Sequence, residues 1–257
     1  MKTALTIAGF DPTCGAGLAG DLRTFSAFGF YGLGIASAVT AQNSQGVQDL
    51  APVAPGLISQ QLASIWADYK PWAIKIGMLP DSASMKAVAD GLSKKERPWV
   101  VVDPVMRAHR GGQLMDPQSI KILKERLLPL ATLVTPNVYE AERLTGQHLD
   151  SVRQLEIAAR RLNEECRCAV LIKGWQTADS VLDILYLANE LRHFQLPRLD
   201  RADVHGTGCA LSSALAVSLA LGNSLTDAVR IAKEYVWKGI DQALPGARGM
   251  FIFNHFA

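Results

Sequence analysis

Short apolar runs alternate with longer amphipathic segments along most of the chain, and this alternation strongly limits the folds open to it. Each run is rich in Val, Ile, Leu or Ala and precedes Gly, Pro or Asp, as buried strands that end in a turn do. We expect strands at residues 5–8, 34–39, 73–76, 100–102, 133–135 and 169–172. We expect helices at residues 19–28, 55–69, 82–92, 117–128, 138–144, 152–165, 207–221 and 225–243. This order predicts a three-layer α/β/α fold with a mostly parallel central sheet.

The segment before the last two helices has a different pattern. Two β-prone runs, residues 181–187 and 191–196, flank a polar turn at Asn189 and Glu190, which predicts an antiparallel hairpin. The sequence has no linker, low-complexity tract or internal repeat. We therefore expect one domain that spans residues 1–257.

Composition indicates which classes of partner and which cellular compartment to expect. The formal charge is +2, and no basic run interleaved with aromatic residues occurs, so we expect a small-molecule partner and no nucleic acid. No stretch reaches the ~20 apolar residues of a membrane span, so we expect no membrane partner. The four cysteines form neither a disulfide framework nor a zinc motif, which favours the cytoplasm.

The segments that follow the strands are more polar and richer in glycine than the strands themselves. They are residues 9–21, 40–46, 75–80, 103–112, 135–140 and 173–176. In an open parallel sheet the carboxyl ends of the strands border the ligand crevice, so we expect these segments to converge there. Each also has a plain interpretation as a turn.

Gly15, Gly17 and Gly20 match G-x-G-x-x-G, the fingerprint of dinucleotide-binding folds. That fingerprint also requires a carboxylate at the end of the second strand, and residues 40–43 contain none. We interpret these glycines as a lining that lets the backbone approach another small ligand.

Three further strand ends carry candidate site residues. Asp103 follows three valines and either holds Mg²⁺ through water or caps a turn. Asn137 and Glu140 form N-x-x-E at a helix start, and taken alone they indicate a capping box. Lys173 ends a buried strand, where its charged amine needs a counter-anion, and a nucleotide phosphate would serve.

A glycine turn at residues 204–209, with the sequence VHGTGC, opens the long apolar run at residues 210–221. Backbone N–H groups in such a turn, together with the helix dipole, favour a phosphate-like anion. The same field predicts a lowered pKa for Cys209, which would make its thiol a better proton acceptor. The alternative is a plain helix start with a buried, inert cysteine.

As an ordered set, these motifs resemble the ribokinase-like superfamily of small-molecule kinases. In that superfamily an N-x-x-E element helps to organise Mg²⁺, and D-T-x-G-A-G-D supplies an anion hole and a catalytic Asp. Here the second element runs from Asp203 to Cys209, so Cys209 replaces the usual base. The HGTGC variant is similar to the hydroxymethylpyrimidine and phosphomethylpyrimidine kinases of thiamine biosynthesis. Segments such as KIGML, VVDPVM, LVTPNVYEAERLTG and VLIKG extend this similarity over residues 4–256.

The resemblance implies ATP and Mg²⁺ as cofactors and a small-molecule pyrimidine as substrate. It implies an anion hole at Gly206, Thr207 and Gly208, a base at Cys209, nucleotide contacts at Lys173, Asn137 and Glu140, and metal contacts at Asp103 and Glu140. It implies pyrimidine contacts at Gly9, Ala16, Asp21, Thr40, Gln42, Met78 and Val105. The Gln42 amide carries a donor and an acceptor, which match the ring nitrogen and exocyclic amine of an aminopyrimidine.

Four positions depart from the family pattern. Phe10 and Cys14 would reshape the pyrimidine pocket, and Trp175 and Val204 would flank the phosphates. Pyridoxal kinase, a ligand-binding protein that has lost the chemistry, and a dinucleotide oxidoreductase remain alternatives. We also expect a homodimer. Apolar residues such as Trp66 and Trp72 would pack either in the core of the subunit or in the contact between subunits.

Overall fold

The computed structural model describes residues 1–92, 98–108, 111–201 and 204–257, and in these residues nine strands form one sheet. The strand order is β3-β2-β1-β4-β5-β6-β7-β8-β9. Strands from β2 to β7 pair in parallel, whereas β3, β8 and β9 pair antiparallel at the two edges. The bounds are β1 Thr3–Phe10, β2 Tyr31–Asn43, β3 Gly46–Pro52, β4 Ala73–Ile76, β5 Trp99–Val102, β6 Leu133–Val134, β7 Ala169–Gln176, β8 Ser180–Leu187 and β9 Glu190–Pro197.

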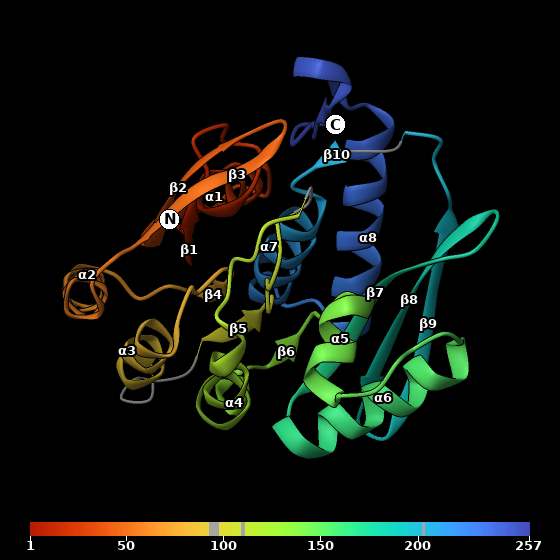
Figure 1. Cartoon of the computed structure of the whole chain (residues 1–257), viewed down its shortest axis with the longest axis horizontal. Helices are drawn as coiled ribbons and strands as arrows, with labels where there is room; N and C mark the ends of the chain where they lie inside the picture. The colour runs from red at the N-terminus through yellow and green to blue at the C-terminus, as the bar shows by residue number, and fades with distance from the viewer. Residues whose placement is uncertain (93–97, 109–110, 202–203) are drawn as a thin grey trace.

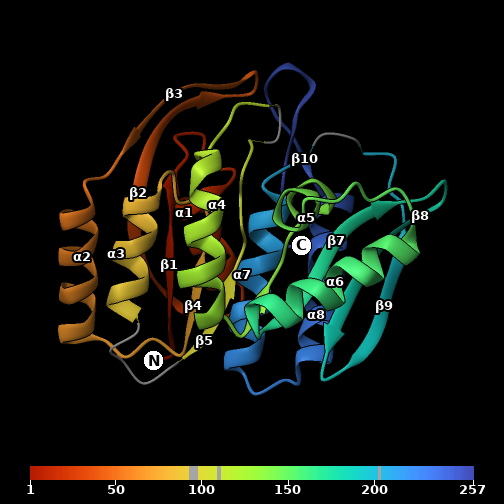
Figure 2. The ribbon, with the colours of Figure 1, turned by 60° about the horizontal axis from the view of Figure 1, so that its bottom comes forward.

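Helices cover both faces of this sheet. They are α1 Gly17–Ala27, α2 Pro55–Asp68, α3 Ser82–Leu92, α4 Ile120–Ile122, α5 Val138–Thr145, α6 Val152–Cys166, α7 Thr207–Ala220 and α8 Leu225–Asp241. In Figure 1, α2, α3, α4 and α6 lie below the sheet and α1, α7 and α8 lie above it, and Figure 2 shows the first group from its outer side. Successive strand residues therefore point into different cores: Leu5 and Ile7 pack in one, and Ala4 packs in the other. The predicted three-layer fold with a mostly parallel sheet is confirmed.

The predicted helix at residues 117–128 is the element that differs most. A 3₁₀ turn at Pro117–Ser119, the short α4, a π-type turn at Leu123–Leu127 and a second 3₁₀ turn at Leu128–Leu130 replace one regular helix. Pro129 lies in the last turn, where its ring and missing N–H prevent regular α-helical hydrogen bonding.

Two strand regions were not predicted. β3 forms the antiparallel edge against β2, although Gly, Asp and Pro make its sequence a weak strand former. A small second sheet has the order β10-β12-β11 and joins Val204–His205, Phe251–Ile252 and Leu244–Pro245. This small sheet holds the chain immediately before α7. None of the described helices is both long and apolar enough to cross a membrane.

Candidate active site

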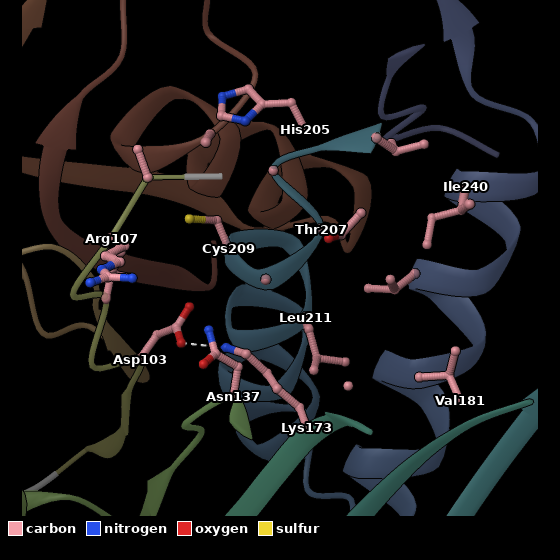
Figure 3. A pocket seen from close by; sticks show the side chains of 18 of the residues that line it. Asp103, Arg107, Asn137, Lys173, Val181, His205, Thr207, Cys209, Leu211 and Ile240 are labelled. Atoms are coloured by element: carbon pink, nitrogen blue, oxygen red, sulfur yellow. Dashed lines mark hydrogen bonds and ion pairs between the residues drawn. The ribbon is translucent and has the colours of Figure 1, made fainter. Parts of the chain in front are cut away.

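A cavity of about 1010 Å³ lies at the carboxyl ends of the parallel strands, and all the strand-end segments predicted to converge contribute to its wall. The predicted site residues that line it are Gly9, Ala16, Thr40, Gln42, Met78, Asp103, Val105, Asn137, Glu140, Lys173, Gly206, Thr207, Gly208 and Cys209. Figure 3 shows Asp103, Asn137, Lys173 and Cys209 gathered around the start of α7.

Asp21 is the predicted contact that the structure does not place on the cavity wall. Its side chain is 0% exposed and accepts hydrogen bonds from Lys75 Nζ at 2.7 and 2.9 Å, from Thr6 Oγ1 at 2.6 Å and from Ser213 Oγ at 2.8 Å. Lys75 is also fully buried, so its charge needs a carboxylate inside the protein. In this structure Asp21 therefore neutralises Lys75 and lies off the cavity wall, and its contact with a ligand stays a prediction.

The start of α7 depends on Gly206. Its φ of 90° favours glycine, and a Cβ at this position would overlap the carbonyl oxygen of Gly15. Thr207, Gly208 and Cys209 form the first turn of α7, where backbone N–H groups have no carbonyl of an earlier turn to bond. These residues line the cavity, so the helix start presents a site for an anion.

The Cys209 side chain is half-buried, and the backbone N–H of Gly17 at the start of α1 is among the groups that act on its thiol. Burial raises the pKa of Cys209 to about 11, although Lys75 and the Gly17 N–H lower it. The predicted lowering of this pKa is therefore wrong. The free-energy cost of desolvating a thiolate exceeds the electrostatic stabilisation that the helix start and Lys75 give it. At neutral pH the thiol carries its proton.

Lys173 finds its counter-anion within the protein. Its Nζ forms an ion pair with the carboxylate of Asp103, which also accepts hydrogen bonds from Thr135 Oγ1 and Ser212 Oγ, both at 3.2 Å. Burial alone would lower the pKa of Lys173, but Asp103 and Glu140 raise it above its usual range. A nucleotide phosphate is therefore not needed to keep this amine charged, and the protonated Lys173 faces the cavity.

Asn137 and Glu140 form the predicted capping box of α5. Asn137 Oδ1 accepts the Glu140 N–H, and Glu140 Oε2 accepts the Asn137 N–H, both at 2.9 Å. Both residues also line the cavity, so the structural and the functional interpretations are compatible. Burial raises the pKa of Glu140 to about 7, Lys173 opposes this shift, and Asp103 adds to it. Two buried carboxylates thus share one lysine, which makes this part of the wall suitable for a cation.

The prediction missed a polar network around His205. Its Nε2 lies 2.9 Å from Asp11 Oδ2 and 3.2 Å from Gln42 Nε2, and Asp11 Oδ2 also accepts the Ala16 N–H at 3.1 Å. Burial tends to raise the pKa of Asp11, but hydrogen bonds from His205 and Thr13 bring it below its usual value. Asp11 in the first strand-end loop and a histidine directly before the glycine turn were the available sequence signals.

A second unpredicted ion pair lies farther along the wall. Lys233 Nζ on α8 lies 2.7 Å from Asp183 Oδ2 on β8, and Asp183 Oδ1 accepts the Gly174 N–H at 2.7 Å. All three residues line the cavity. Gly174 has a φ of 79° and lies where β7 shifts its register against β8, so this bond holds the irregular part of the strand.

The four departures from the family pattern divide into two groups. Phe10 and Val204 line the cavity, whereas Cys14 and Trp175 do not. Trp175 packs against the hydrophobic core on the α6 side, because β7 shifts its register against β8 just before this residue. The prediction that Trp175 flanks the phosphates is therefore wrong. Asp203 lies outside the described residues.

The glycines of the G-x-G-x-x-G match also have different roles. Gly17 lines the cavity, but Gly15 and Gly20 do not. A Cβ on Gly15 would lie 2.6 Å from His205 Cδ2, and one on Gly20 would lie 3.2 Å from the Gly15 carbonyl oxygen. For these two glycines the close approach is to the protein itself, so their interpretation as a ligand lining is corrected.

Comparisons with known proteins identify the family of the chain. A profile of the phosphomethylpyrimidine kinase family matches residues 11–254. A hydroxymethylpyrimidine/phosphomethylpyrimidine kinase of Staphylococcus aureus is 39% identical over 100% of this chain and 94% of that protein. A thiamine biosynthesis bifunctional protein of Geobacter sulfurreducens is 42% identical over 98% of the chain, which spans only 52% of that relative.

Among solved structures, an ADP complex of Bacillus subtilis pyridoxal kinase has a TM-score of 0.92. It is 32% identical, and the match covers 99% of this chain and 97% of that one. The fold is thus shared with kinases named for two different substrates. From the family match and the full-length similarity, the chain belongs to the phosphomethylpyrimidine kinase family.

Proposed function

We propose that the chain transfers the γ-phosphoryl group of ATP to 4-amino-5-hydroxymethyl-2-methylpyrimidine, and then to the monophosphate product, in thiamine biosynthesis. The observation that carries the proposal is the meeting of Lys173, the first turn of α7 and the Cys209 thiol on one cavity wall. Phosphoryl transfer requires positioned reactants and neutralised oxygens more than covalent help from the protein, and these groups supply both.

The cavity has two ends in this proposal. We define the pyrimidine end by Gly9, Thr40, Gln42, Met78 and Val105, and the nucleotide end by Val181, Leu211, Lys233 and Ile240, all of which line the cavity. The start of α7 lies between them, and Figure 3 shows Val181 and Ile240 on the side of α7 away from Arg107. This order fits an in-line transfer past the helix start.

In the first transfer, Gln42 would bind the aminopyrimidine, and its Nε2 lies 3.2 Å from His205 Nε2 at the edge of the Asp11–His205 pair. The N–H groups of the first α7 turn would surround the γ-phosphoryl group, and Lys173 would neutralise its oxygens. The thiolate of Cys209 would accept the proton of the hydroxymethyl group. Because burial raises the pKa of this thiol to about 11, only a small fraction of the enzyme molecules carry Cys209 as a thiolate at neutral pH.

The residues present fit a magnesium ion. Mg²⁺ is usually bound through one or two carboxylates together with waters and substrate phosphates, so a larger cluster is unnecessary. No group of three or more His, Cys, Asp or Glu that could hold a metal occurs among the described residues. Asp103 and Glu140 would hold the ion, whose charge would offset that of the phosphates. Burial raises the pKa of Glu140 and Asp103 adds to the shift, so a bound cation would stabilise the ionised form of this carboxylate.

Phosphorus NMR of a reaction with ATP and the hydroxymethylpyrimidine tests the proposal directly. We expect a monophosphate signal first and a diphosphate signal later, with ADP formed in step. A reaction that leaves ATP unchanged, with the protein folded and the nucleotide bound, would overturn it. Parallel reactions without Mg²⁺ test the metal, and none of these should form product.

Pyridoxal phosphorylation is the second candidate, because the structural similarity to a pyridoxal kinase extends over 99% of the chain. A comparison of kcat/KM for pyridoxal and the hydroxymethylpyrimidine distinguishes the two functions. We further propose a cytoplasmic homodimer. Trp72 is 50% exposed, whereas Trp66 packs against the core, so Trp72 is the better candidate for a contact between subunits. Sedimentation of wild type and Trp72→Ser tests this.

A further inference from the structure

Arg107 is a basic residue of the cavity wall to which the proposed chemistry assigns no role. It follows β5 in the chain and lines the same cavity as Asp103 and Cys209. In Figure 3 it lies on the opposite side of Cys209 from Ile240 and Val181, and therefore away from the nucleotide end. Its neighbours Val105 and Ala108 pack with Met78 in one small apolar cluster. Arg107 thus belongs to the pyrimidine end.

The guanidinium of Arg107 is oriented by an aromatic ring. Its Cζ lies 4.2 Å from the ring centroid of Tyr139, which is on the first turn of α5. Stacking of this kind restrains a long side chain and leaves the edge donors of the guanidinium available. Among the described residues no carboxylate forms an ion pair with it, and it is an exposed side chain on the cavity wall.

The other basic side chains of the cavity differ from Arg107. Lys173 and Lys233 are each paired with a buried aspartate. Arg198 and Arg201 follow β9 near α8, and Arg201 donates to the carbonyl of Ala243 at 3.0 Å. An anion that enters the pyrimidine end would therefore meet Arg107 as its available partner there.

The two proposed transfers place different charges at that end. The hydroxymethyl substrate is neutral, whereas its monophosphate carries a charge of about −1.5 to −2 at pH 7. In the second transfer, an oxygen of this phosphate bonds to the γ-phosphorus as the bond to the β,γ-bridging oxygen breaks, and ADP leaves with that electron pair. When the monophosphate enters as the dianion, no proton is released. Two phosphate groups must then approach each other, which the first transfer does not require.

We propose that Arg107 binds the phosphate of the monophosphate substrate and serves the second transfer specifically. Arginine suits this task because its planar guanidinium donates two parallel hydrogen bonds to phosphate oxygens. Tyr139 positions the side chain, and since no carboxylate in the described part of the chain pairs with Arg107, its charge is left for the substrate. This inference rests on the proposed function and assigns one residue to one of its two steps.

Separate kinetics for the two substrates test the inference, with ADP release measured from purified hydroxymethylpyrimidine or purified monophosphate. A charge-assisted hydrogen bond contributes about 1.5–3 kcal/mol, so we expect Arg107→Gln to lower kcat/KM for the monophosphate by roughly 10- to 100-fold, mainly through KM. We expect less than about a threefold change with the hydroxymethylpyrimidine. Arg107→Lys should recover part of the loss, because it restores the charge without the paired donors.

Arg143→Gln is the matched control. Arg143 is an exposed arginine on α5 that borders a small neighbouring cavity with Arg107 and Tyr139 but does not line the main one. We expect this variant to behave as wild type with both substrates. Melting temperatures of all three variants check the fold.

The other possible results would overturn either the role of Arg107 or the proposed function. Equal losses with the two substrates, or no loss with either, would overturn the role of Arg107 while the proposed function stands. A wild-type enzyme that phosphorylates the hydroxymethylpyrimidine but not the monophosphate would also overturn it. A wild-type enzyme inactive with both pyrimidines would overturn the proposed function, and the inference with it.

Discussion

The proposed role of Cys209 predicts that the two phosphoryl transfers respond differently to pH. With a pKa of about 11, roughly one enzyme molecule in 10⁴ holds the thiolate at pH 7, whereas an ordinary thiol with a pKa of 9.0 would give about one in 100. If the thiolate accepts the hydroxymethyl proton, kcat/KM for the first transfer should rise about tenfold per pH unit between pH 7 and 9.

The second transfer provides an internal reference on the same enzyme. Its nucleophile is a phosphate with a second pKa near 6, which is already deprotonated above pH 7 and needs no base. We therefore expect kcat/KM for the monophosphate to stay nearly constant from pH 7 to 9. The measurement is ADP release with each substrate, with coupling enzymes in proven excess at every pH.

Variants at this position separate the base from other titrating groups. Cys209→Ala should lower the first transfer substantially, remove its pH dependence and leave nucleotide binding largely intact. The second transfer should fall much less. Charged groups that act on this thiol are Lys75, Lys173, Asp21 and Asp103, so the apparent pKa belongs to the cluster. A flat profile for the first transfer in wild type, or wild-type turnover in Cys209→Ala, would refute the proposed proton transfer.

Three further predictions concern the framework of the site. Lys75→Met leaves Asp21 buried without its partner and should lower the free energy of unfolding by about 3–5 kcal/mol in urea titrations. The double variant with Asp21→Asn should recover part of this loss. A loss below about 1 kcal/mol in Lys75→Met would contradict the pairing. The pKa of Glu140, raised from 4.5 to about 7, means that its stabilising effect is complete below pH 4.5 and is lost as pH rises through 7. Without Mg²⁺, Glu140→Gln should therefore be more stable than wild type at pH 8 by up to about 3 kcal/mol, and equal stability there would contradict the shift. Gly206→Ala should reduce both melting temperature and activity, because its Cβ would overlap the carbonyl oxygen of Gly15. Gly222→Ala is the control. Gly222 has a similar φ of 93°, but an added Cβ there would have no atom within 4 Å, so this variant should show the backbone strain alone.

Local sequence patterns predicted most of the regular elements because their physical causes are local. The strand at Ala73–Ile76 and the helix at Ser82–Leu92 have their predicted bounds. Their apolar spacing already defines which residues are buried. The edge strand Gly46–Pro52 was missed, because its residues are weak strand formers and its stability comes from pairing with β2.

The wall of the site was also largely predictable, since polar residues at strand ends converge in any sheet of this topology. The ion pairs and pKa shifts of the site could not be predicted in this way. Whether Asp21 contacts a ligand or a lysine, and whether Cys209 has a lowered or a raised pKa, depends on distances between α1, β4 and α7. Lys75 was not singled out by the sequence, because a lysine inside a short strand gives no sign of what faces it.

By itself, the sequence determined the layered α/β architecture, the family and the residues at the strand ends that line the cavity, since each depends on spacing and residue type along the chain. The tertiary structure alone decided which charges are paired and which remain available. It placed Asp21 on Lys75, Asp103 on Lys173, and Arg107 on the ring of Tyr139. The physical reason is that desolvation and Coulomb energies depend on distance and burial, and these arise only when separate elements of the chain pack together.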